Sequence, residues 1–523
     1  MRWDVIGLVT GWTLRIFAMP LAVVGAYSVY ADGWEFAVKT YAVALLLAFA
    51  ISQWLIAKAH GHDVQNRVRD REAFTAVALG WPPVVFLGAI PFWLGGMFHG
   101  PFEFLAGDST FAQMCVGALH SWFESMSGFT TTGASIIDPS TSPVCAGDFD
   151  GDCVGSQRKS LILWRSLSQW IGGMGVIMLG LLIFSKALGG GMALARAELT
   201  GPTVSNLGTT LEGTARKLWA IYIGLTILEG LLLFQFTEMG SFDSLNYALT
   251  TMPSGGFATS DTGIMAFDDA LIESIIMVFM VLTCINFSLL YFGFSGRFGE
   301  LWKDEELRTY LLILFVAWVA MAFNLTRSGN YEFVESMRYS LFQSISISST
   351  GYSSADFSNW PVFSQVVLLL LMIVGASAGS TGGGLKVLRI RVAFELAKRE
   401  VMKIIQPRKV VAIRFNQQIV DENRIWIILG MVSSWMVLVT LSILTISFLE
   451  PSLTMTDVLS VSISLLGNTG PALGSFGPVD AASTWADLSL PSMFVSTILM
   501  WLGRLELLTV LVLLHPRTWA GTS

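Results

Sequence analysis

"SISISSTGYSSADF" occupies residues 344–357 and places a polar, glycine-centred stretch between two apolar segments. Related stretches occur four times along the chain. They read "GFTTTGAS" from residue 128, "MPSGGFAT" from 252, "ISSTGYSS" from 347 and "LGNTGPAL" from 466. One such stretch alone would be an ordinary loop rich in turn-forming residues. Four of them in register, spread along one chain, indicate an internal repeat.

In each copy, two mostly small or hydroxyl-bearing residues precede the shared glycine, and none of these residues is charged. The four filter motifs are Thr131, Thr132 and Gly133; Ser254, Gly255 and Gly256; Ser349, Thr350 and Gly351; and Asn468, Thr469 and Gly470. Glycine tolerates positive φ, so successive carbonyl groups can turn toward a common axis. Rings of backbone carbonyls can replace the hydration shell of a monovalent cation. Four converging copies therefore predict a cation filter.

The composition indicates a polytopic membrane protein. The 523 residues are 53% hydrophobic and 13% charged, with a mean hydropathy of +0.62, whereas a soluble protein carries about 25% charged residues. Apolar windows of membrane-spanning length predict ten spans, at 6–30, 38–57, 73–97, 159–185, 215–236, 270–293, 308–325, 364–388, 424–448 and 490–514. Shorter apolar stretches of re-entrant length lie at 109–129, 241–252, 333–348 and 454–466.

The expected fold is an all-α polytopic membrane protein. A span, a short pore helix, a filter loop and a second span occur four times around a central pore, after two N-terminal spans. Irregular backbone at membrane depth is tolerated where it is buried or lines a watery cavity, and four converging loops satisfy that condition. The expected boundaries are 1–71 for the two N-terminal spans and 72–190, 191–300, 301–409 and 410–523 for the four units.

Loops rich in Lys and Arg alternate with acidic or neutral loops in this topology. The basic segments are 58–71, 215–217, 296–308 and 386–409. The positive-inside rule places these segments and both termini in the cytoplasm. Cys145 and Cys153 then share an outer loop. An oxidising compartment permits a disulfide there, and two free thiols are the alternative.

Several stretches resemble the Trk/Ktr/HKT potassium-transporter superfamily. They are "STGYSSADF" from residue 349, "NTGPALG" from 468, "ASAGSTGGGLKVLRI" from 376, "WRSLSQWIGGMGVIML" from 164 and "GRLELLTVLVL" from 503. The two additional N-terminal spans resemble the bacterial branch of this family, the TrkH-type potassium uptake subunits. The resemblance covers nearly the whole chain.

The resemblance implies potassium uptake across a bacterial inner membrane by a homodimer with one pore per subunit. K+ would be the transported ion, bound at the four filter glycines, with no covalently bound cofactor. In related plant proteins a serine at the first filter glycine goes with sodium permeation, so Gly133 favours potassium. The second motif departs from the pattern at Ser254 and Gly255, which implies an asymmetric filter.

Residues 375–386 interrupt a long apolar run with consecutive glycines. Each glycine costs a helix about 1 kcal/mol relative to alanine, so the preceding span is expected to break here. The resemblance implies an intramembrane gating loop beneath the filter, and a kink that aids helix packing is the alternative. The residues assigned to gating are Gly375, Ala376, Gly379, Ser380, Thr381, Gly382, Gly383, Gly384, Lys386 and Arg504.

Arg504 lies inside the last predicted span, where a charged side chain is costly. The resemblance places it in the pore near the gating loop, where its charge would limit cation occupancy. Snorkelling toward the cytoplasmic interface is the alternative. Glu506 lies on a different helix face, so a local ion pair is not expected. Glu229 is a second ionisable group within a predicted span, and the sequence identifies no partner for it.

The basic stretch 386–409 carries eight Lys or Arg residues. Such a stretch sets topology and contacts lipid headgroups. The resemblance adds docking of a cytosolic, TrkA-like regulatory subunit that binds nucleotides. This chain has no nucleotide motif of its own, because the glycines of 375–386 lack phosphate-loop spacing. No nucleic-acid partner is expected.

Gated passive conduction is the expected mechanism, and symport of K+ with H+ or Na+ is the runner-up, with Glu229 as its candidate coupling site. An ammonium channel would need paired intramembrane histidines, and only His120 falls at membrane depth. An enzyme is disfavoured because no common catalytic motif occurs. A voltage-gated channel is disfavoured because no span carries Lys or Arg at every third position.

Overall fold

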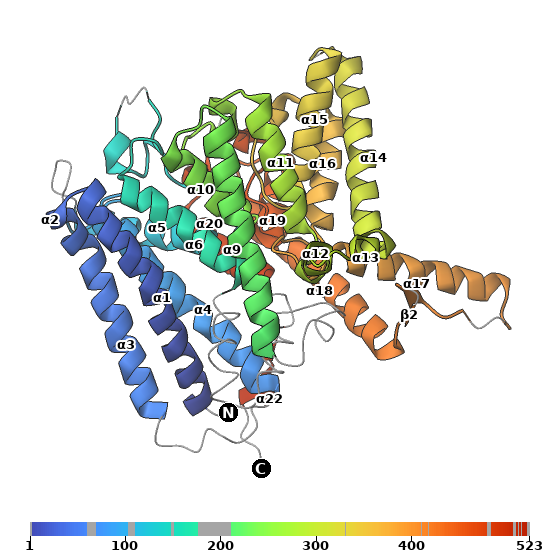
Figure 1. Cartoon of the computed structure of the whole chain (residues 1–523), viewed down its shortest axis with the longest axis horizontal. Coiled ribbons are helices and arrows are strands. Elements are labelled where there is room, and N and C mark those ends of the chain that lie inside the picture. Colours follow the sequence, from blue (N-terminus) through green and yellow to red (C-terminus); the bar gives the residue numbers. More distant parts are fainter. Residues whose placement is uncertain are drawn as a thin grey trace.

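The computed structural model describes residues 3–59, 70–102, 110–147, 151–175, 211–329, 331–408, 411–416, 418–478, 483–505, 509–510, 512–513 and 515–519. Over these residues the chain is a bundle of helices (Figure 1). Both termini lie at the lower end of the molecule in this view. The helical fold with membrane-length spans expected from the sequence is confirmed by this architecture.

Two long apolar helices at the N-terminus lie side by side at one edge of the bundle (Figure 1). The first is α1 (Trp3–Ala31). The second is continuous from Trp34 to Ala59 and comprises α2 (Trp34–Ala37), a π-helical turn η1 (Val38–Ala42) and α3 (Val43–Ala59). Both are long and apolar enough to cross a membrane, as predicted for the two N-terminal spans.

A long helix, a short helix, an irregular loop and a further helix then follow one another four times. The first set is α4 (Asp70–Leu94), α5 (Phe111–Phe129) and α6 (Lys159–Met174). The second is α9 (Leu211–Phe236), α10 (Ser241–Thr251), α11 (Ala270–Cys284) and α12 (Phe287–Phe294). The third is α14 (Glu305–Ser328), α15 (Phe333–Ile347) and α16 (Val362–Val374). The fourth is α18 (Glu422–Leu449), α19 (Met455–Gly467) and α20 (Leu490–Arg504).

Three of the four short helices begin with a capping box, in which the first residue and the fourth exchange hydrogen bonds between side chain and main chain. Thr110 and Gln113 form this exchange at α5, and Thr454 and Asp457 form it at α19. These three short helices therefore start from their own sequence signals, whereas α10 has no side-chain cap. All four short helices end next to one of the filter motifs.

The described residues contain fewer helices of spanning length than the ten spans that the sequence predicts. Among the described residues, six helices are long and apolar enough to cross a membrane, or seven if α11 and α12 form one bent span. The predicted continuous span 270–293 is wrong, because α12 leaves α11 at 109°. Asn286 causes this break locally, since its side chain caps α12 by accepting a hydrogen bond from the Ser288 N–H.

The closing helix of the third set breaks where the glycines predict. Within the apolar window 364–388, α16 ends at Val374 and Gly375 takes a φ of 68°, which confirms the expected break at residues 375–386. Within the predicted span 490–514, α20 ends at Arg504. Within 159–185, α6 ends at Met174, and residues 176–185 lie outside the described residues. Hydropathy alone does not register a break such as the one at Gly375, because it reflects composition and not the direction of the chain.

The remaining elements are small or peripheral. Helix α17 (Val387–Ile405) contains most of the basic stretch and projects sideways from the bundle (Figure 1). A hairpin of β1 (Arg414–Phe415) and β2 (Gln418–Ile419) follows, which the sequence did not predict. The others are η2 (Pro143–Cys145), η4 (Gly263–Ala266), α13 (Phe298–Lys303), η5 (Phe357–Asn359), η6 (Gly474–Phe476), η7 (Trp485–Asp487) and α22 (Pro516–Trp519).

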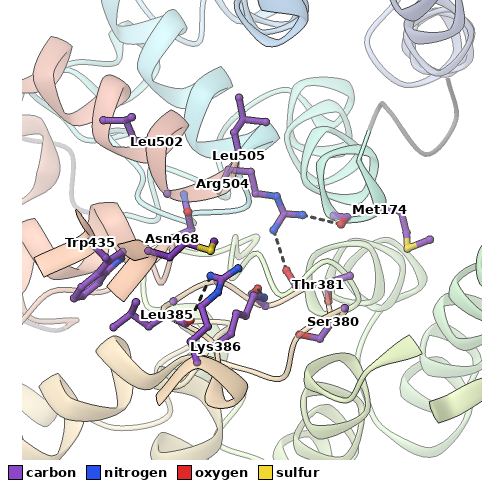
Figure 2. Close-up of a pocket in the computed structure, with 18 of the residues that line it drawn as sticks. Met174, Ser380, Thr381, Leu385, Lys386, Trp435, Asn468, Leu502, Arg504 and Leu505 are labelled. Atoms are coloured by element: carbon purple, nitrogen blue, oxygen red, sulfur yellow. Dashed lines mark hydrogen bonds between the residues drawn. The ribbon is translucent and has the colours of Figure 1, made fainter. Parts of the chain in front are cut away.

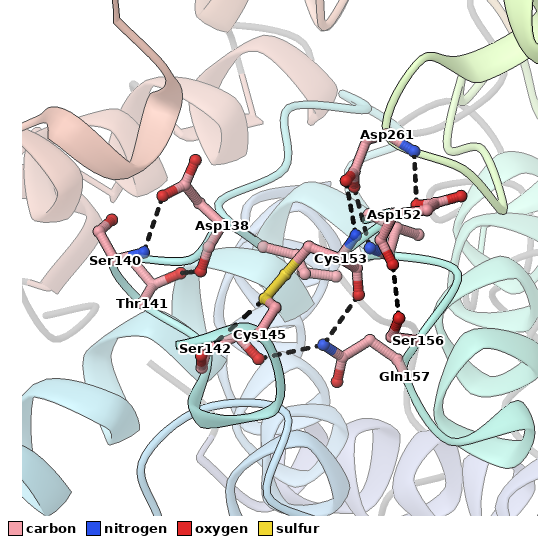
Figure 3. The surroundings of a disulfide bond; sticks show 12 residues. Asp138, Ser140, Thr141, Ser142, Cys145, Asp152, Cys153, Ser156, Gln157 and Asp261 are labelled. Carbon is pink, nitrogen blue, oxygen red and sulfur yellow. Dashed lines mark hydrogen bonds between the residues drawn. A yellow bond between two sulfur atoms is a disulfide. The ribbon is translucent and has the colours of Figure 1, made fainter. Parts of the chain in front are cut away.

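A disulfide joins Cys145 to Cys153 in the loop between α5 and α6 (Figure 3). The backbone N–H groups of Cys153 and Val154 donate to the carboxylate of Asp261 at 2.6 and 2.9 Å. Asp261 in turn donates its own N–H to Asp152 at 3.0 Å. The disulfide-bonded loop of the first set is thereby attached to the chain that follows the second filter motif.

Candidate functional site

The chain reverses direction sharply where three of the short helices end. The first motif residue takes a left-handed conformation in these copies, with φ of 53° at Thr131, 58° at Ser254 and 51° at Asn468. The next N–H bonds to the carbonyl five residues earlier, at 2.9 Å from Thr132 to Ser127, 2.9 Å from Gly255 to Thr250 and 3.0 Å from Thr469 to Ser464. This is the Schellman type of helix end, which small and polar residues favour.

The third motif makes its turn differently. Ser349 does not have a positive φ. The carbonyl of Ser346 instead accepts from three successive N–H groups, those of Ser349 at 3.1 Å, Thr350 at 2.8 Å and Gly351 at 2.9 Å. The sequence predicted that the second motif would be the asymmetric one. Its turn, however, has the same geometry as the turns of the first and fourth motifs. The third turn is the one that differs.

The four motif glycines all have positive φ, and each packs against the next motif. Their φ angles are 85° at Gly133, 79° at Gly256, 89° at Gly351 and 98° at Gly470. A Cβ on any of them would collide with a carbonyl oxygen of the following motif: Gly133 with Gly255, Gly256 with Thr350, Gly351 with Thr469, and Gly470 with Thr132. Only glycine fits both the conformation and the space.

These four contacts form a closed cycle from the first motif through the second, third and fourth and back to the first. The structure thus brings all twelve predicted filter residues together in one ring. The oxygen at each junction belongs to the residue just before a motif glycine. A ring of main-chain carbonyls with no charged side chain among its members is suited chemically to a desolvated monovalent cation.

Side chains outside the motifs, which the sequence analysis did not single out, form hydrogen bonds to the ring and to a helix end beside it. Gln169 of α6 donates to the Gly255 carbonyl at 2.7 Å and accepts from the Phe257 N–H at 3.2 Å. The Tyr352 hydroxyl, directly after the third motif, lies 2.5 Å from Thr250 Oγ1. A polar residue inside a predicted span was the signal by which the sequence could have indicated Gln169. Its partner, Gly255, lies 86 residues away, so the contact itself could not be predicted.

Residues 375–386 run from the end of α16 to the start of α17 and lie directly against the filter motifs. Thr381 Oγ1 lies 3.1 Å from Ser254 Oγ and donates to the Met252 carbonyl at 3.1 Å. The Gly384 N–H donates to the Gly467 carbonyl at 2.9 Å. A Cβ on Gly382 would collide with Ser349 Oγ. The segment therefore contacts the second, third and fourth filter loops or their helix ends.

Arg504 at the end of α20 connects this loop to α6 (Figure 2). Its Nη1 donates to the Thr381 carbonyl at 2.9 Å. Its Nη2 donates to the carbonyls of Gly172 and Gly173, each at 2.7 Å. The side chain thus turns into the protein, and its hydrogen bonds join residues of the first, third and fourth sets. Carbonyls at a helix C-terminus attract a cation through the helix dipole as well.

A cavity of about 130 Å³ lies beside the loop (Figure 2). Its lining includes Asn468 of the fourth filter motif and Arg504. The predicted gating residues on it are Gly379, Ser380, Thr381, Gly382, Gly383, Gly384, Lys386 and Arg504. Gly375 and Ala376 are not on this lining. They pack against two residues that do line it, Gly383 and Gly384, and the Ala376 N–H donates to the Gly383 carbonyl at 3.4 Å.

Two further residues that the sequence analysis did not identify attach the loop to neighbouring helices. Glu306 of α14 accepts from the N–H groups of Ala378 at 2.7 Å and Leu388 at 3.1 Å. Asn286, which breaks the helix between α11 and α12, donates to the Ala378 carbonyl at 2.8 Å. Lys386 donates within the loop, to the Gly382 carbonyl. Main-chain hydrogen bonds from Ser377 to the Cys284 carbonyl and from Thr381 to the Thr283 carbonyl, at 3.1 and 3.3 Å, attach the loop as well. The loop is thus fixed by both main-chain and side-chain groups of other elements.

Comparison with known proteins gives a consistent result. The family model TrkH, described as a cation transport protein, matches residues 44–519. The Trk system potassium uptake protein TrkH of Halomonas elongata is 30% identical, over 94% of this chain and 93% of the relative. The Trk system potassium uptake protein TrkH of Escherichia coli is 29% identical, over 99% of this chain and 100% of the relative. The crystal structure of the potassium transporter TrkH from Vibrio parahaemolyticus aligns with a TM-score of 0.81 at 25% identity, over 99% and 100%.

Proposed function

The chain belongs to the TrkH family of cation transport proteins, and we propose that it takes up potassium ions through a filter formed by its four glycine motifs. It is an integral membrane protein with several apolar spanning helices. The relatives from Halomonas elongata and Escherichia coli are named as potassium uptake proteins. This agrees with the prediction of a transporter and not an enzyme.

The closed ring of four loops is the observation that carries the proposal. A potassium ion that enters the ring would exchange its water shell for main-chain carbonyls, with hydroxyl oxygens of the motif residues nearby. The filter consists of the twelve motif residues named above. Because Gly133, Gly256, Gly351 and Gly470 are packed against their neighbours, the carbonyls are held close together without the help of charged ligands.

Conduction is gated by residues 375–386. The loop lies against three of the filter loops and lines the cavity beside them. Arg504 holds it in this position through the Thr381 carbonyl and places a positive charge at the same cavity. Opening requires the loop to move away from the ring, which would break this hydrogen bond. Glycines at both ends, Gly375 and Gly384, give the backbone the freedom to do so.

The cellular setting is a bacterial inner membrane, with both termini and α17 on the cytoplasmic side. The charge of α17 supports this orientation under the positive-inside rule. This helix also exposes Phe394 and Ile404, and it projects from the bundle (Figure 1). We propose that it docks a cytosolic, TrkA-like nucleotide-binding subunit beside the lipid surface, and that two copies of this chain form a homodimer.

Symport is the second candidate, and the position of Glu229 favours it. Glu229 is fully buried in the middle of α9 and forms no ion pair with any residue in the described ranges. An ionisable group at membrane depth is a typical coupling site in proton-driven transporters. Reversal potentials in liposomes at several proton gradients separate the two mechanisms. A potential that follows potassium alone supports passive conduction.

The proposal is tested by potassium and sodium flux through the purified chain in proteoliposomes, with and without Gly351→Ser. A serine at this position would collide with the Thr469 carbonyl and would hold a φ of 89° that it rarely adopts. We expect the wild-type chain to prefer potassium and the variant to lose much of that preference. Unchanged discrimination in a folded variant would contradict the assignment of the filter.

A further inference from the structure

A buried ion pair joins α5 to α6 beside the first two filter loops. Glu124 of α5 is fully buried and Arg165 of α6 is 2% exposed. Arg165 Nε lies 2.6 Å from Glu124 Oε1. The attraction between two buried charges is largely offset by the cost of removing them from water. Such a pair is therefore informative mainly through the other groups that the two charges contact.

Glu124 contacts the chain that leaves the first filter motif. Its Oε1 accepts from Ser135 Oγ at 3.0 Å, and its Oε2 accepts from the Ile136 N–H at 3.1 Å. Ser135 and Ile136 are the second and third residues after Gly133. The carboxylate therefore fixes the direction in which the main chain leaves the ring at this motif.

Arg165 contacts the equivalent stretch of the second motif. Its Nη1 donates to the Ala258 carbonyl at 2.8 Å. Its guanidinium carbon lies 3.5 Å from the centre of the Phe257 ring, a close cation–π contact. Phe257 and Ala258 are the first and second residues after Gly256. One ion pair thus holds the outgoing chains of two neighbouring filter loops.

We propose that Glu124 and Arg165 are positioning residues that set the spacing between the first and second filter loops and thereby contribute to the discrimination of K+ from Na+. The junction that they support is the one at which Gly133 packs against the Gly255 carbonyl. Selectivity depends on how many carbonyls converge on the ion and how freely they move. The inference rests on the proposed function, since it assumes that the ring is the filter.

The other filter loops are supported differently. Asp457 accepts from the Ser475 N–H at 2.7 Å and from its hydroxyl at 3.1 Å, all within the fourth set. In the third set, Ser346 Oγ donates to the Tyr352 carbonyl at 2.6 Å. Across the part of the chain that the structure describes, Glu124 and Arg165 form the one ion pair that connects the chains leaving two filter motifs.

The chain offers a control for this pair. Arg338 of α15 donates to Glu273 of α11 through Nε at 2.8 Å and through Nη2 at 3.0 Å, and Glu273 is 2% exposed. Arg338 also donates to Asp268 at 3.1 Å. These hydrogen bonds reach no filter motif and none of the three residues that follow one. Each arginine thus has its own buried carboxylate partner, but only Arg165 contacts residues that directly follow a filter motif.

The test compares Arg165→Lys with Arg338→Lys in potassium and sodium flux assays on the reconstituted full chain. Lysine retains the positive charge but lacks the planar fork that serves two acceptors at once. We expect Arg165→Lys to lower the K+/Na+ flux ratio by about tenfold, equivalent to 1.4 kcal/mol of discrimination. Arg338→Lys should leave the ratio unchanged. Melting temperatures of the purified variants show whether both remain folded.

Glu124→Gln provides a second variant in case Arg165→Lys does not fold, and we expect it to lower the ratio as well, because it removes the charge that holds Arg165. A folded variant of this pair with the wild-type ratio overturns the inference. Equal losses in Arg165→Lys and Arg338→Lys overturn it too, since they would reflect general destabilisation. Both outcomes leave the proposed function intact. A wild-type chain that does not discriminate K+ from Na+ overturns the proposed function and the inference together.

Discussion

The ring of filter motifs and the loop of residues 375–386 are both irregular, glycine-rich and buried, but their contacts with the rest of the chain are arranged differently. In the ring, each motif glycine packs against the main chain of the next motif, so that Gly256, for example, leaves no room for a Cβ beside the Thr350 carbonyl. The loop is attached by main-chain hydrogen bonds to Thr283, Cys284, Phe287 and Gly467 and also by side chains of other elements, chiefly those of Arg504, Glu306 and Asn286.

This difference indicates which of the two parts can move. The ring is a closed cycle of main-chain contacts, so displacing one motif requires displacing its neighbours as well. The loop is not part of such a cycle, because separate main-chain and side-chain hydrogen bonds hold it. A hydrogen bond to a charged group contributes about 1.5–3 kcal/mol. Such bonds can be broken in sequence while the helices stay in place. We therefore expect substitutions in the ring to destroy selectivity and substitutions at the loop attachments to change how often the pore is open.

The largest effect is expected from Gly256→Ala. The added Cβ would collide with the Thr350 carbonyl at a φ of 79°, so the ring cannot close at this junction. We expect potassium-selective flux in proteoliposomes to fall to the level of empty vesicles.

Gly263→Ala is the control for this substitution. Gly263 also has a positive φ, 62°, but its nearest neighbouring atom, the Cβ of Ala258, would lie 3.9 Å away. Alanine there would adopt the strained left-handed conformation, which costs about 1–2 kcal/mol. It would not collide with a neighbouring atom. Flux should persist in this variant. Equal losses in both variants would mean that strain, and not packing of the ring, limits the site.

The next largest effect is expected from Arg504→Gln. This change removes the charged donor that holds the Thr381, Gly172 and Gly173 carbonyls together. Losing one such bond weakens the closed arrangement enough to raise basal potassium flux about tenfold or more, since 1.4 kcal/mol corresponds to a factor of ten. Flux through the chain without any added partner is the measurement.

Arg391→Gln is the control for the arginine. Arg391 lies on α17 and donates to Thr309 Oγ1 at 2.7 Å and to the Glu305 carboxylate at 2.7 Å, without a described contact to the loop. Basal flux should remain at the wild-type level in this variant. A decrease in basal flux in Arg504→Gln would show that the arginine supports the open pore, which contradicts its proposed role.

The same difference explains how much could be predicted from the sequence. The ring depends on a short pattern of residue types that is written four times, so all four motifs were identifiable. The groups around it depend on pairs far apart in the sequence. Arg165 and Gln169 lie inside a stretch whose family resemblance was evident, yet their contacts with Ala258 and Gly255 lie 93 and 86 residues away. Only the folded chain brings such groups together.

The prediction of one continuous span at 270–293 was wrong for a related reason. Hydropathy registers that residues 270–293 are apolar, but the direction of the chain is decided by one polar residue, Asn286, whose side chain caps α12 and contacts the Ala378 carbonyl. The expected break at residues 375–386 was identifiable because consecutive glycines cannot maintain a helix. A single capping residue within an apolar run gives a much weaker signal than a run of glycines.

The smallest effect is expected at the outer loop, where removing the disulfide by Cys145→Ser with Cys153→Ser tests whether the ring needs outside support. Closing an eight-residue loop stabilises a chain by about 2–3 kcal/mol in the chain-entropy description, so the melting temperature should fall slightly. Cys115→Ser, which alters a free thiol, should not lower it. The K+/Na+ flux ratio should equal that of the wild type, because the motif glycines pack on one another and not on this loop. A reduced ratio in the double variant would mean that the attachment through Asp261 helps to hold the second filter loop, and the ring could then no longer be regarded as held by its own main chain.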